Sequence, residues 1–397
     1  MSGVTAPWRW QHIVAAVMAV GALAGCGSMP SWSIPAPSLD WITGRGDASK
    51  PGPLPELVPT ATATVAWQVK IGRSQPGLSP AITADAIYAA ASDGALVRID
   101  PQTGRTVWRI SAGKPLAAGP GADGSLVVVA TDKGDVLAFD PDGKPMWTSR
   151  VSSEVSAPPA VAEGVVVVSS GDGRIYGLNS ADGKTKWVNQ RINPPLTIRN
   201  HAGGVVSRGG IFLGLPGGRL LAMDLQTGSV GWDCAVATPK GATELERIAD
   251  VTSRPVVEER HACAVAFQGR LACFELLRGT LQWTRDVSSL TGIASDIAAF
   301  YVVDESGALH AFDRSTGASL WKQDSIAGRK PRGAQVVGTH VGVIDVAGYL
   351  HLFTQATGVY VGRLATDGSA PTGQPHRFGE RMVWQSLAGT VYAVDSR

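Results

Sequence analysis

Few residues in this chain have the types and spacing that enzyme chemistry requires. The segment 119–124 matches the GxGxxG pattern of dinucleotide-binding loops, but that motif must follow a strand and open a helix. Here it leads into a strand-like apolar run at 125–130. Neither a GxSxG nor an HExxH motif is present, and the seven histidines are scattered. The sequence therefore predicts no catalytic residue, no metal site and no cofactor.

Aspartate–glycine pairs recur along the chain and could suggest calcium binding. Examples are Asp93–Gly94, Asp172–Gly173 and Asp182–Gly183. Calcium loops need alternating acidic residues closed by a glutamate, a pattern that no segment of the sequence provides. The pairs instead predict hairpin turns, in which the aspartate bonds its own turn backbone and glycine tolerates positive φ.

The four cysteines, Cys26, Cys234, Cys263 and Cys273, lack the spacing of zinc ligands. Cys263 and Cys273 flank a predicted hairpin at 268–269. A two-residue turn would put them on opposite faces, whereas a three-residue turn would put them opposite each other, where they could form a disulfide in an oxidising compartment. The alternative is a pair of small buried thiols in the core.

The strands and turns that would position any functional residue belong to a sequence repeat. Its best example is 306–321, SGALHAFDRSTGASLW: a glycine hairpin, an alternating strand, a second glycine turn and a strand with a tryptophan. A period of about 40 residues with several short strands is typical of a β-propeller with four-stranded blades. The hairpin glycines are Gly94, Gly134, Gly173, Gly218, Gly269, Gly307, Gly348 and Gly389, and the tryptophans are Trp108, Trp147, Trp187, Trp232, Trp283 and Trp321.

The two ends of the repeat region complement each other. The last repeat, from Gly389, stops before its tryptophan strand, whereas a spare strand around Trp67 precedes the first repeat. Pairing these strands would close the ring and remove two open sheet edges. We therefore expect an all-β, eight-bladed propeller over residues 60–397, closed by an N-terminal strand in the last blade. Gly362 replaces the tryptophan of the penultimate repeat, which predicts a looser blade contact there.

Residues 1–25 have the features of an export signal. Arg9 precedes a 12-residue apolar run, which is too short to span a bilayer permanently. The run ends in LAGC at 23–26, which resembles the processing box of bacterial lipoproteins, with Cys26 as the lipidated residue. The alternative is an ordinary signal peptide that contains a cysteine. Gly27, in place of the aspartate that favours retention at the inner membrane, implies the outer membrane.

The segment 26–59 follows as a tether, since its seven prolines disfavour helix and packed sheet. Acyl chains on Cys26 would anchor the protein firmly, so the body needs no membrane-binding surface of its own. The formal net charge is only +2 and runs of charge are absent, so nothing indicates a nucleic-acid partner.

Two insertions, at 193–204 and 237–252, lengthen the links from one blade to the next. In an up-and-down blade such links lie on one face of the ring, so we expect the insertions to be neighbours there. Exposed Leu196 and Ile198 beside Arg199 would resemble the centre of a protein interface. The alternative is that the two aliphatic residues tuck under the loop as a small satellite core. The segment 243–250 could form about two turns of helix.

The repeat resembles that of pyrroloquinoline-quinone enzymes, although their vicinal cysteines and calcium site have no counterpart in this sequence. The lipoprotein box, the proline-rich tether, the eight repeats and the segments 348–351 (GYLH) and 389–392 (GTVY) are together more similar to the BamB family. Its members are lipoprotein subunits of the machinery that assembles outer-membrane β-barrels.

This resemblance implies a non-enzymatic scaffold, lipid-anchored on the periplasmic face of the outer membrane, that assists folding and insertion of β-barrel proteins. The implied partners are the periplasmic domains of BamA, other subunits of the machinery and unfolded outer-membrane proteins. Leu196, Ile198 and Arg199 fall where the family has a Leu-x-Leu-Arg loop that contacts BamA, and Asp250 falls in its acidic partner loop. Thr252 stands where the family pattern has a second aspartate.

Two other classes of function remain open. A pyrroloquinoline-quinone-dependent dehydrogenase, or its non-catalytic relative, would share the repeat. A carbohydrate-binding propeller would expose aromatic residues on one face, and Trp384 is the one spare tryptophan of the body outside the repeat positions.

Overall fold

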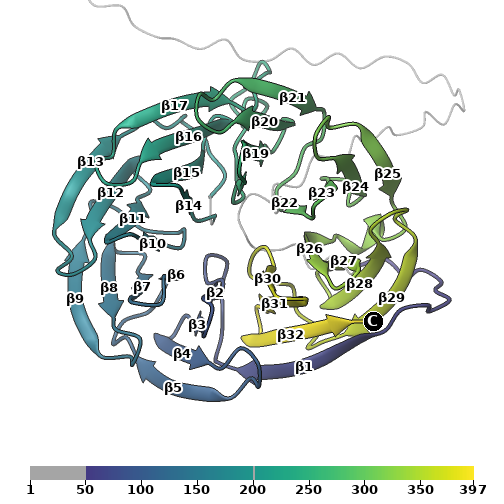
Figure 1. The fold of residues 1–397 in the computed structure, drawn as a ribbon, viewed down its shortest axis with the longest axis horizontal. Helices are drawn as coiled ribbons and strands as arrows, with labels where there is room; N and C mark the ends of the chain where they lie inside the picture. The colour runs from purple at the N-terminus through teal and green to yellow at the C-terminus, as the bar shows by residue number, and fades with distance from the viewer. Residues whose placement is uncertain (1–50, 200–201) are drawn as a thin grey trace, which may run out of the picture. The chain divides into compact units, whose positions relative to one another are not determined.

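The computed structural model describes residues 51–199 and 202–397, which form eight four-stranded antiparallel sheets arranged in a ring (Figure 1). The predicted eight-bladed β-propeller is confirmed. The predicted export signal, Cys26 and most of the predicted tether lie outside the described residues. Within the described part, no helix is long and apolar enough to span a membrane.

Each blade runs from an innermost strand at the central channel to an outermost strand at the rim. Blades one to four comprise β2 (Ala81–Ile82), β3 (Ile87–Ala90), β4 (Ala95–Ile99) and β5 (Thr106–Ser111); β6 (Ala118–Ala122), β7 (Val127–Ala130), β8 (Asp135–Phe139) and β9 (Pro145–Arg150); β10 (Ala160–Ala162), β11 (Val165–Ser169), β12 (Arg174–Asn179) and β13 (Thr185–Gln190); and β14 (Val205–Ser207), β15 (Gly210–Leu215), β16 (Arg219–Asp224) and β17 (Val230–Ala235).

Blades five to eight follow the same order, except that the first strand of the chain completes the last blade. They comprise β18 (Val256–Val257), β19 (His261–Val265), β20 (Leu271–Glu275) and β21 (Leu281–Arg285); β22 (Ile293–Ser295), β23 (Ala299–Val303), β24 (Leu309–Asp313) and β25 (Ser319–Gln323); β26 (Arg332–Val337), β27 (His340–Ile344), β28 (Tyr349–Thr354) and β29 (Tyr360–Ala365); and β30 (His376–Phe378), β31 (Arg381–Gln385), β32 (Thr390–Ser396) and β1 (Ala63–Lys70).

Burial follows the position of a strand in its blade. The second strands, such as β7 and β23, are buried along their whole length because neighbouring blades cover both of their faces. The outermost strands, such as β5 and β9, alternate between partly buried and exposed residues, since only one face packs inward. Residues 165–168 of β11, a second strand, are buried in the same way as β7 and β23.

The ring closes as predicted, by pairing β1 with β32. Trp67 lies opposite Ala393, and the eighth sheet has the order β1-β32-β31-β30. Beyond the paired strands, the Thr62 N–H donates to the Arg397 carbonyl at 2.8 Å, and the Arg397 N–H donates to the Thr62 carbonyl at 3.0 Å. The two ends of the propeller are thus held together by an antiparallel ladder, with one register shift between Val65 and Trp67, and this ladder covers the edge of β32.

A tryptophan packs against the next blade at seven of the eight blade junctions. The Trp67 indole lies against Gly104, where an added Cβ would approach the Trp67 side chain to 2.6 Å, and its N–H donates to the Pro101 carbonyl at 3.0 Å. Glycine is required at this turn by both the close approach and the positive φ of 72°. The same packing recurs at Trp108–Gly143, Trp147–Gly183, Trp187–Gly228, Trp232–Gly279, Trp283–Gly317 and Trp321–Gly358.

The prediction of a looser contact at Gly362 is wrong. The backbone of Ala61 occupies this position, and a Cβ added to Gly362 would meet the Ala61 carbonyl oxygen at 2.7 Å. The N–H groups of Thr60 and Ala61 both donate to the Val361 carbonyl, at 2.9 and 3.0 Å. A tryptophan at position 362 would stack on a glycine turn between the two outer strands of blade eight. These two strands, β32 and β1, come from the two ends of the chain and are not joined by a turn. The N-terminal segment fills the space between blades seven and eight instead.

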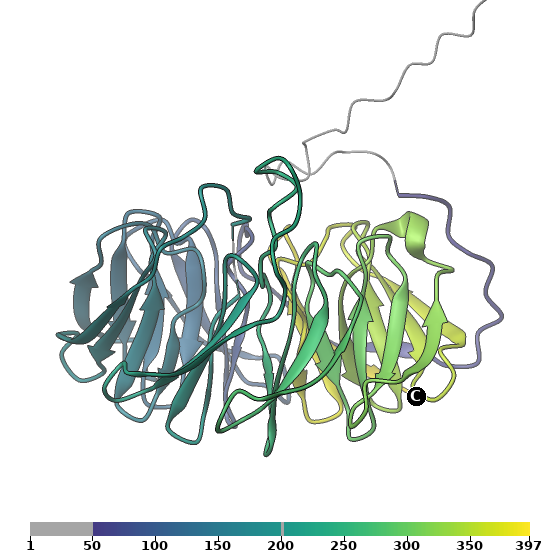
Figure 2. The same ribbon diagram turned by 90° about the horizontal axis from the view of Figure 1, so that it is seen from above.

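Residues 51–62 form an N-terminal strap that runs along the outer side of blade seven to the start of β1 (Figure 2). At its start, the Gly52 N–H donates to the Gly328 carbonyl in the short 3-10 helix η2 (Ala327–Arg329) at 2.8 Å. The Arg329 guanidinium donates to the Gly52 carbonyl at 2.6 Å, and Arg363 donates to the Pro55 carbonyl at 3.2 Å. The last part of the predicted tether therefore lies against the propeller.

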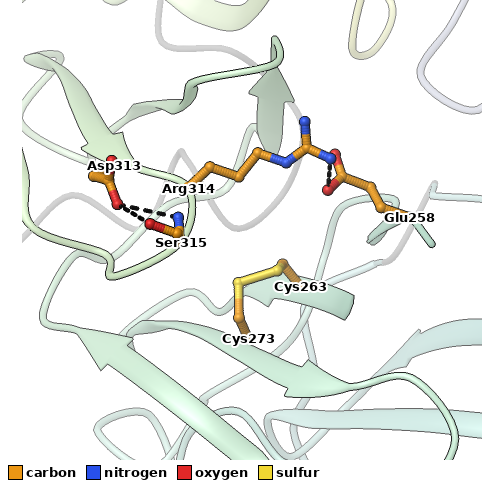
Figure 3. Close-up of a disulfide and its surroundings, with 6 residues drawn as sticks. All are labelled: Glu258, Cys263, Cys273, Asp313, Arg314 and Ser315. Carbon is orange, nitrogen blue, oxygen red and sulfur yellow. Dashed lines mark hydrogen bonds and ion pairs between the residues drawn. A yellow bond between two sulfur atoms is a disulfide. The ribbon is translucent and has the colours of Figure 1, made fainter. Parts of the chain in front are cut away.

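Cys263 and Cys273 are paired across β19 and β20 in blade five, with the two sulfur atoms bonded at 1.97 Å (Figure 3). The Ala266 N–H donates to the Arg270 carbonyl, which leaves a three-residue turn at 267–269. The three-residue turn puts the two cysteines opposite each other, which is the arrangement that a disulfide requires.

Trp384 is almost fully buried and stacks on Tyr392, so it offers no exposed aromatic platform.

Candidate docking surface

The two insertions lie together on one side of the ring. We call this side, which carries the links from each outermost strand to the next innermost strand, the loop face. The first insertion follows β13 and the second follows β17, and both rise from the loop face (Figure 2). The Ile198 N–H donates to the Asp250 carboxylate at 2.6 Å, which joins the two insertions directly. The prediction that they are neighbours is confirmed.

Asp250 lies beneath this contact and not on the surface. Its side chain is almost completely buried, and its second carboxylate oxygen accepts a hydrogen bond from the Gly217 N–H at 2.8 Å. Burial raises the pKa of Asp250, while the two backbone N–H groups act in the opposite direction. The family resemblance implies that Asp250 belongs to a loop that contacts the partner, whereas the structure buries this carboxylate, where it positions the first insertion.

Most of the apolar residues of the second insertion face inward. Ile248, Ala249 and Val251 are all buried, and two of these, Ala249 and Val251, belong to the apolar core between blades four and five. The insertion also has one turn with a capping box, in which the Thr243 hydroxyl accepts from the Glu246 N–H and the Glu246 carboxylate accepts from the Thr243 N–H. The expected two turns of helix are wrong, because the segment ends in the extended backbone that buries Ile248 and Val251.

The first insertion presents its residues to solvent. Leu196 is 43% exposed, Arg199 is exposed and Ile198 is partly buried. Ile198 therefore has part of the satellite-core role, whereas Leu196 is available to a partner. Sequence reasoning missed Ile192, which is 98% exposed at the start of this link, and Leu245, which is 44% exposed in the second insertion. Ile192 could have been found from the sequence, because it is an aliphatic residue just after the outermost strand of its blade.

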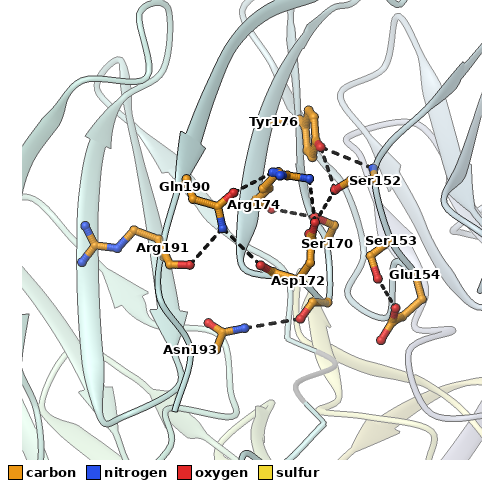
Figure 4. Close-up of polar contacts among 11 residues, drawn as sticks. Ser152, Ser153, Glu154, Ser170, Asp172, Arg174, Tyr176, Gln190, Arg191 and Asn193 are labelled. Atoms are coloured by element: carbon orange, nitrogen blue, oxygen red, sulfur yellow. Dashed lines mark hydrogen bonds and ion pairs between the residues drawn. The ribbon is translucent and has the colours of Figure 1, made fainter. Parts of the chain in front are cut away.

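A polar network fixes the base of the first insertion on blade three (Figure 4). The Gln190 amide donates to the Asp172 and Arg191 carbonyls, both at 3.2 Å, and accepts from the Arg174 guanidinium at 2.6 Å. The Asn193 amide donates to the Gly171 carbonyl at 3.3 Å. The first insertion is thus attached, where the chain leaves β13, to the turn between β11 and β12 of blade three.

Glu154, in the preceding link, is the acidic group whose charge is coupled to Arg199. A hydrogen bond from Ser153 is the largest cause that lowers the pKa of Glu154, and the positive charge of Arg199 adds to it. Thr252 stands at the position of the second aspartate in the family pattern, and its hydroxyl donates to the Leu290 carbonyl at 3.1 Å. The second insertion therefore has no exposed carboxylate at either position 250 or position 252.

The opposite side of the ring has an open groove of about 650 Å³ between blades five and six. Glu258, Ile297 and Arg314 are among its lining residues, and Arg314 forms an ion pair with Glu258 (Figure 3). Because Arg314 is already paired with Glu258, this groove is a weaker candidate for a charged ligand. Across 51–199 and 202–397, no group of three or more His, Cys, Asp or Glu side chains is arranged to hold a metal ion.

Comparison with known proteins identifies the family. Residues 92–323 match the family model described as outer membrane protein assembly factor BamB. The chain belongs to the BamB family. It is 42% identical to the BamB of Nitrosomonas eutropha over 82% of this chain and 80% of that protein. It is 36% identical to the BamB of Bordetella pertussis over 98% of this chain and 97% of that protein.

Solved structures agree with this assignment. The crystal structure of BamB from Moraxella catarrhalis superposes with a TM-score of 0.77 and 25% identity, covering 84% of this chain and all of that one. A quinohemoprotein alcohol dehydrogenase from Comamonas testosteroni superposes with a TM-score of 0.64 at 12% identity, covering 84% of this chain and 76% of that one. The dehydrogenase shares the propeller fold alone.

Proposed function

We propose that this chain is a non-enzymatic assembly factor for outer-membrane β-barrel proteins, which holds the periplasmic domains of BamA on its loop face. The observation that carries the proposal is the contact between the two insertions, where buried Asp250 fixes the backbone of Ile198 and leaves Leu196 and Arg199 outward. A rigid propeller with two long loops on one face is suited to binding a partner. The family name supports the role in assembly.

Lipidation of Cys26 would hold the protein at the periplasmic face of the outer membrane. The described chain starts on the loop face, because Gly52 is bound to η2 in the link between β25 and β26. The strap then descends along blade seven to β1. Gly52, near the start of the described chain, and the docking loops are therefore on the same side of the ring.

Other subunits of the machinery and unfolded outer-membrane proteins are further partners in this proposal. A chain in transit could pair with an exposed outermost strand by β-augmentation. The strap bonds to Val361 and Arg363 of β29, so the edge of blade seven is covered at those residues. Strand addition would then take place at other blades.

Binding of the full chain to purified BamA periplasmic domains, measured by calorimetry, tests the proposal. We expect a one-to-one complex with a dissociation constant in the micromolar range or tighter, as is usual for an interface with a few apolar anchors. Absence of binding at about 100 µM would contradict it. In parallel, uptake of pyrroloquinoline quinone in the presence of calcium would favour the dehydrogenase alternative, which rests only on the shared fold.

A further inference from the structure

The turn between β19 and β20 of blade five holds the second insertion at both of its ends. The Arg270 guanidinium donates to the Val236 carbonyl at 2.7 Å, where the chain enters the insertion. The Phe267 N–H donates to the Asp250 carbonyl at 2.8 Å, where the insertion ends. This turn therefore fixes the places at which the second insertion leaves the ring and returns to it.

The side chain of Gln268, at the centre of the same turn, holds the middle of the insertion. With its nitrogen on the side that satisfies its neighbours, the Gln268 amide donates to the Glu246 carbonyl at 2.9 Å and to the Ile248 carbonyl at 3.0 Å. Both carbonyls lie at the end of the capped turn that exposes Leu245. One side chain thus attaches this exposed turn to blade five.

Gln268 has a backbone conformation that is strained for its residue type. Its φ is 46°, in the left-handed region that glycine adopts freely and other residues seldom adopt. In the matching hairpins of the other seven blades, every positive φ belongs to a glycine. These glycines are Gly94, Gly134, Gly173, Gly217, Gly218, Gly307, Gly348 and Gly389.

The glycine that follows Gln268 is required for a different reason. Gly269 lies outside the left-handed region, but a Cβ added there would meet the Ala237 Cβ, at the start of the second insertion, at 2.5 Å. Blade five thus uses its glycine for close contact with the insertion and places the left-handed residue one position earlier. The shape of this turn follows from its contact with the second insertion.

The turn projects from a braced base and acts on the first insertion through Asp250. The strands β19 and β20 are largely buried and are cross-linked by the Cys263–Cys273 disulfide (Figure 3). Asp250 accepts from the turn with its backbone carbonyl, and its carboxylate accepts from the Ile198 N–H at 2.6 Å. A continuous chain of contacts therefore runs from this hairpin through the second insertion to the first.

We propose that Gln268 is a positioning residue for the docking surface. Its strained backbone aims the amide at the second insertion, which it holds, together with the first, in the arrangement that a partner binds. Strained conformations persist where the surrounding structure holds them, and they are concentrated at functional sites. A glycine at position 268 would relieve the strain and lose the clamp, so docking should weaken without a loss of stability. The inference rests on the proposed function for the identity of the partner.

Hydrogen exchange of the full chain, measured by mass spectrometry, tests the clamp without any partner. In Gln268→Gly the backbone amides of residues 242–248 should exchange about five-fold faster or more, because the turn that protects them is no longer held. The melting temperature should change little, since relief of strain offsets the greater freedom that glycine gives the unfolded chain. Calorimetry with the BamA periplasmic domains should show binding about three-fold weaker or more.

Two further variants separate the amide from the backbone. Gln268→Glu keeps the strained backbone and the size of the side chain but has no N–H to donate at neutral pH, so it should match Gln268→Gly in exchange and in binding. The matched control is Arg208→Gly, because Arg208 also has a positive φ, of 51°, in an exposed turn on the opposite side of the ring. This control should leave exchange at 242–248 and binding as they are in the wild type.

Exchange at 242–248 that is the same in Gln268→Gly, Gln268→Glu and the wild type would overturn the proposal. A uniform increase throughout the blades would also overturn it, since Gln268 would then serve folding alone. Faster exchange at 242–248 with an unchanged dissociation constant would show that the clamp does not position the docking surface. If the wild type itself does not bind the BamA domains while the exchange result holds, the clamp on the loops is supported and the proposed function fails instead.

Discussion

The two insertions on the loop face differ in what they bury. The first exposes Leu196 and Arg199. The second exposes residues 238–247, but it buries residues 248–251 and holds the first insertion in place through Asp250. The sequence suggests that the two loops together form one contact surface. In the structure, the first is a contact loop and the second supports it. The comparison teaches that an acidic residue in a binding loop can act through the backbone it positions, without touching a partner.

The largest effect should come from removing the apolar anchors of the first insertion. The double variant Leu196→Ala/Ile198→Ala should weaken binding to the BamA periplasmic domains by about 2 kcal/mol or more, roughly 30-fold in dissociation constant. Its melting temperature should change little, because Leu196 is 43% exposed and Ile198 is only partly buried. Calorimetry and thermal unfolding measure the two quantities.

The matched control for this variant is Leu277→Ala/Ile297→Ala, which removes two well-exposed aliphatic side chains from the opposite side of the ring. It should bind as the wild type does. Loss of folding in the Leu196→Ala/Ile198→Ala variant would instead mean that both residues form a satellite core, and the division between contact loop and support would fail.

Removing the support should affect stability and binding together. In Asp250→Ala the N–H groups of Ile198 and Gly217 lose their acceptor, and leaving buried donors unpaired costs about 1–3 kcal/mol in the free energy of unfolding. Urea unfolding measures this loss, and calorimetry should show weaker binding as well. A variant with normal stability but impaired binding would show that Asp250 is itself a contact residue, as the sequence suggested.

Arg199 should have a smaller effect, confined to binding. An exposed charge at the rim of an interface contributes about 0.2–1 kcal/mol, and it acts mainly on the association rate. We therefore expect Arg199→Ala to slow association and to reduce the salt dependence of the rate, as measured by stopped-flow or surface plasmon resonance. An unchanged association rate with faster dissociation would place Arg199 at the centre of the interface.

The pH dependence of stability should give the smallest effect. Because burial raises the pKa of Asp250, the folded state holds this proton more tightly than the unfolded state does. The corresponding stabilisation is complete below the unfolded pKa of about 4 and is lost as the pH rises through the raised folded value. Compared with Asp250→Asn, the wild type should therefore lose stability as the pH rises above about 4. The opposite slope would mean that the hydrogen bonds outweigh burial.

The propeller could be predicted from the sequence because each blade repeats the same local signals. A glycine turn faces the tryptophan of the previous blade, and the unpaired strand around Trp67 matches the missing strand at the C-terminus. The filling of the Gly362 junction could not be predicted, since it depends on where the backbone of Ala61 passes. The strap on blade seven was missed because its prolines resemble those of a free tether.

The position of the candidate site was predictable, but its internal division of roles was not. Loop length alone places both insertions on one face. The burial of Asp250 depends on N–H groups from Ile198 and Gly217, which are 52 and 33 residues away along the chain. No local spacing indicates such partners, so an aspartate in a long loop is interpreted as exposed until the neighbouring backbone is known.

Site-specific photo-crosslinking tests the central claim most directly. A photoreactive residue placed at Leu196 or, as a control, at Leu277 in the full chain would be irradiated with the periplasmic domains of BamA. We predict a crosslink from position 196 and none from position 277, since the two positions lie on opposite sides of the ring. A crosslink from position 277 without one from position 196 would contradict docking through the loop face.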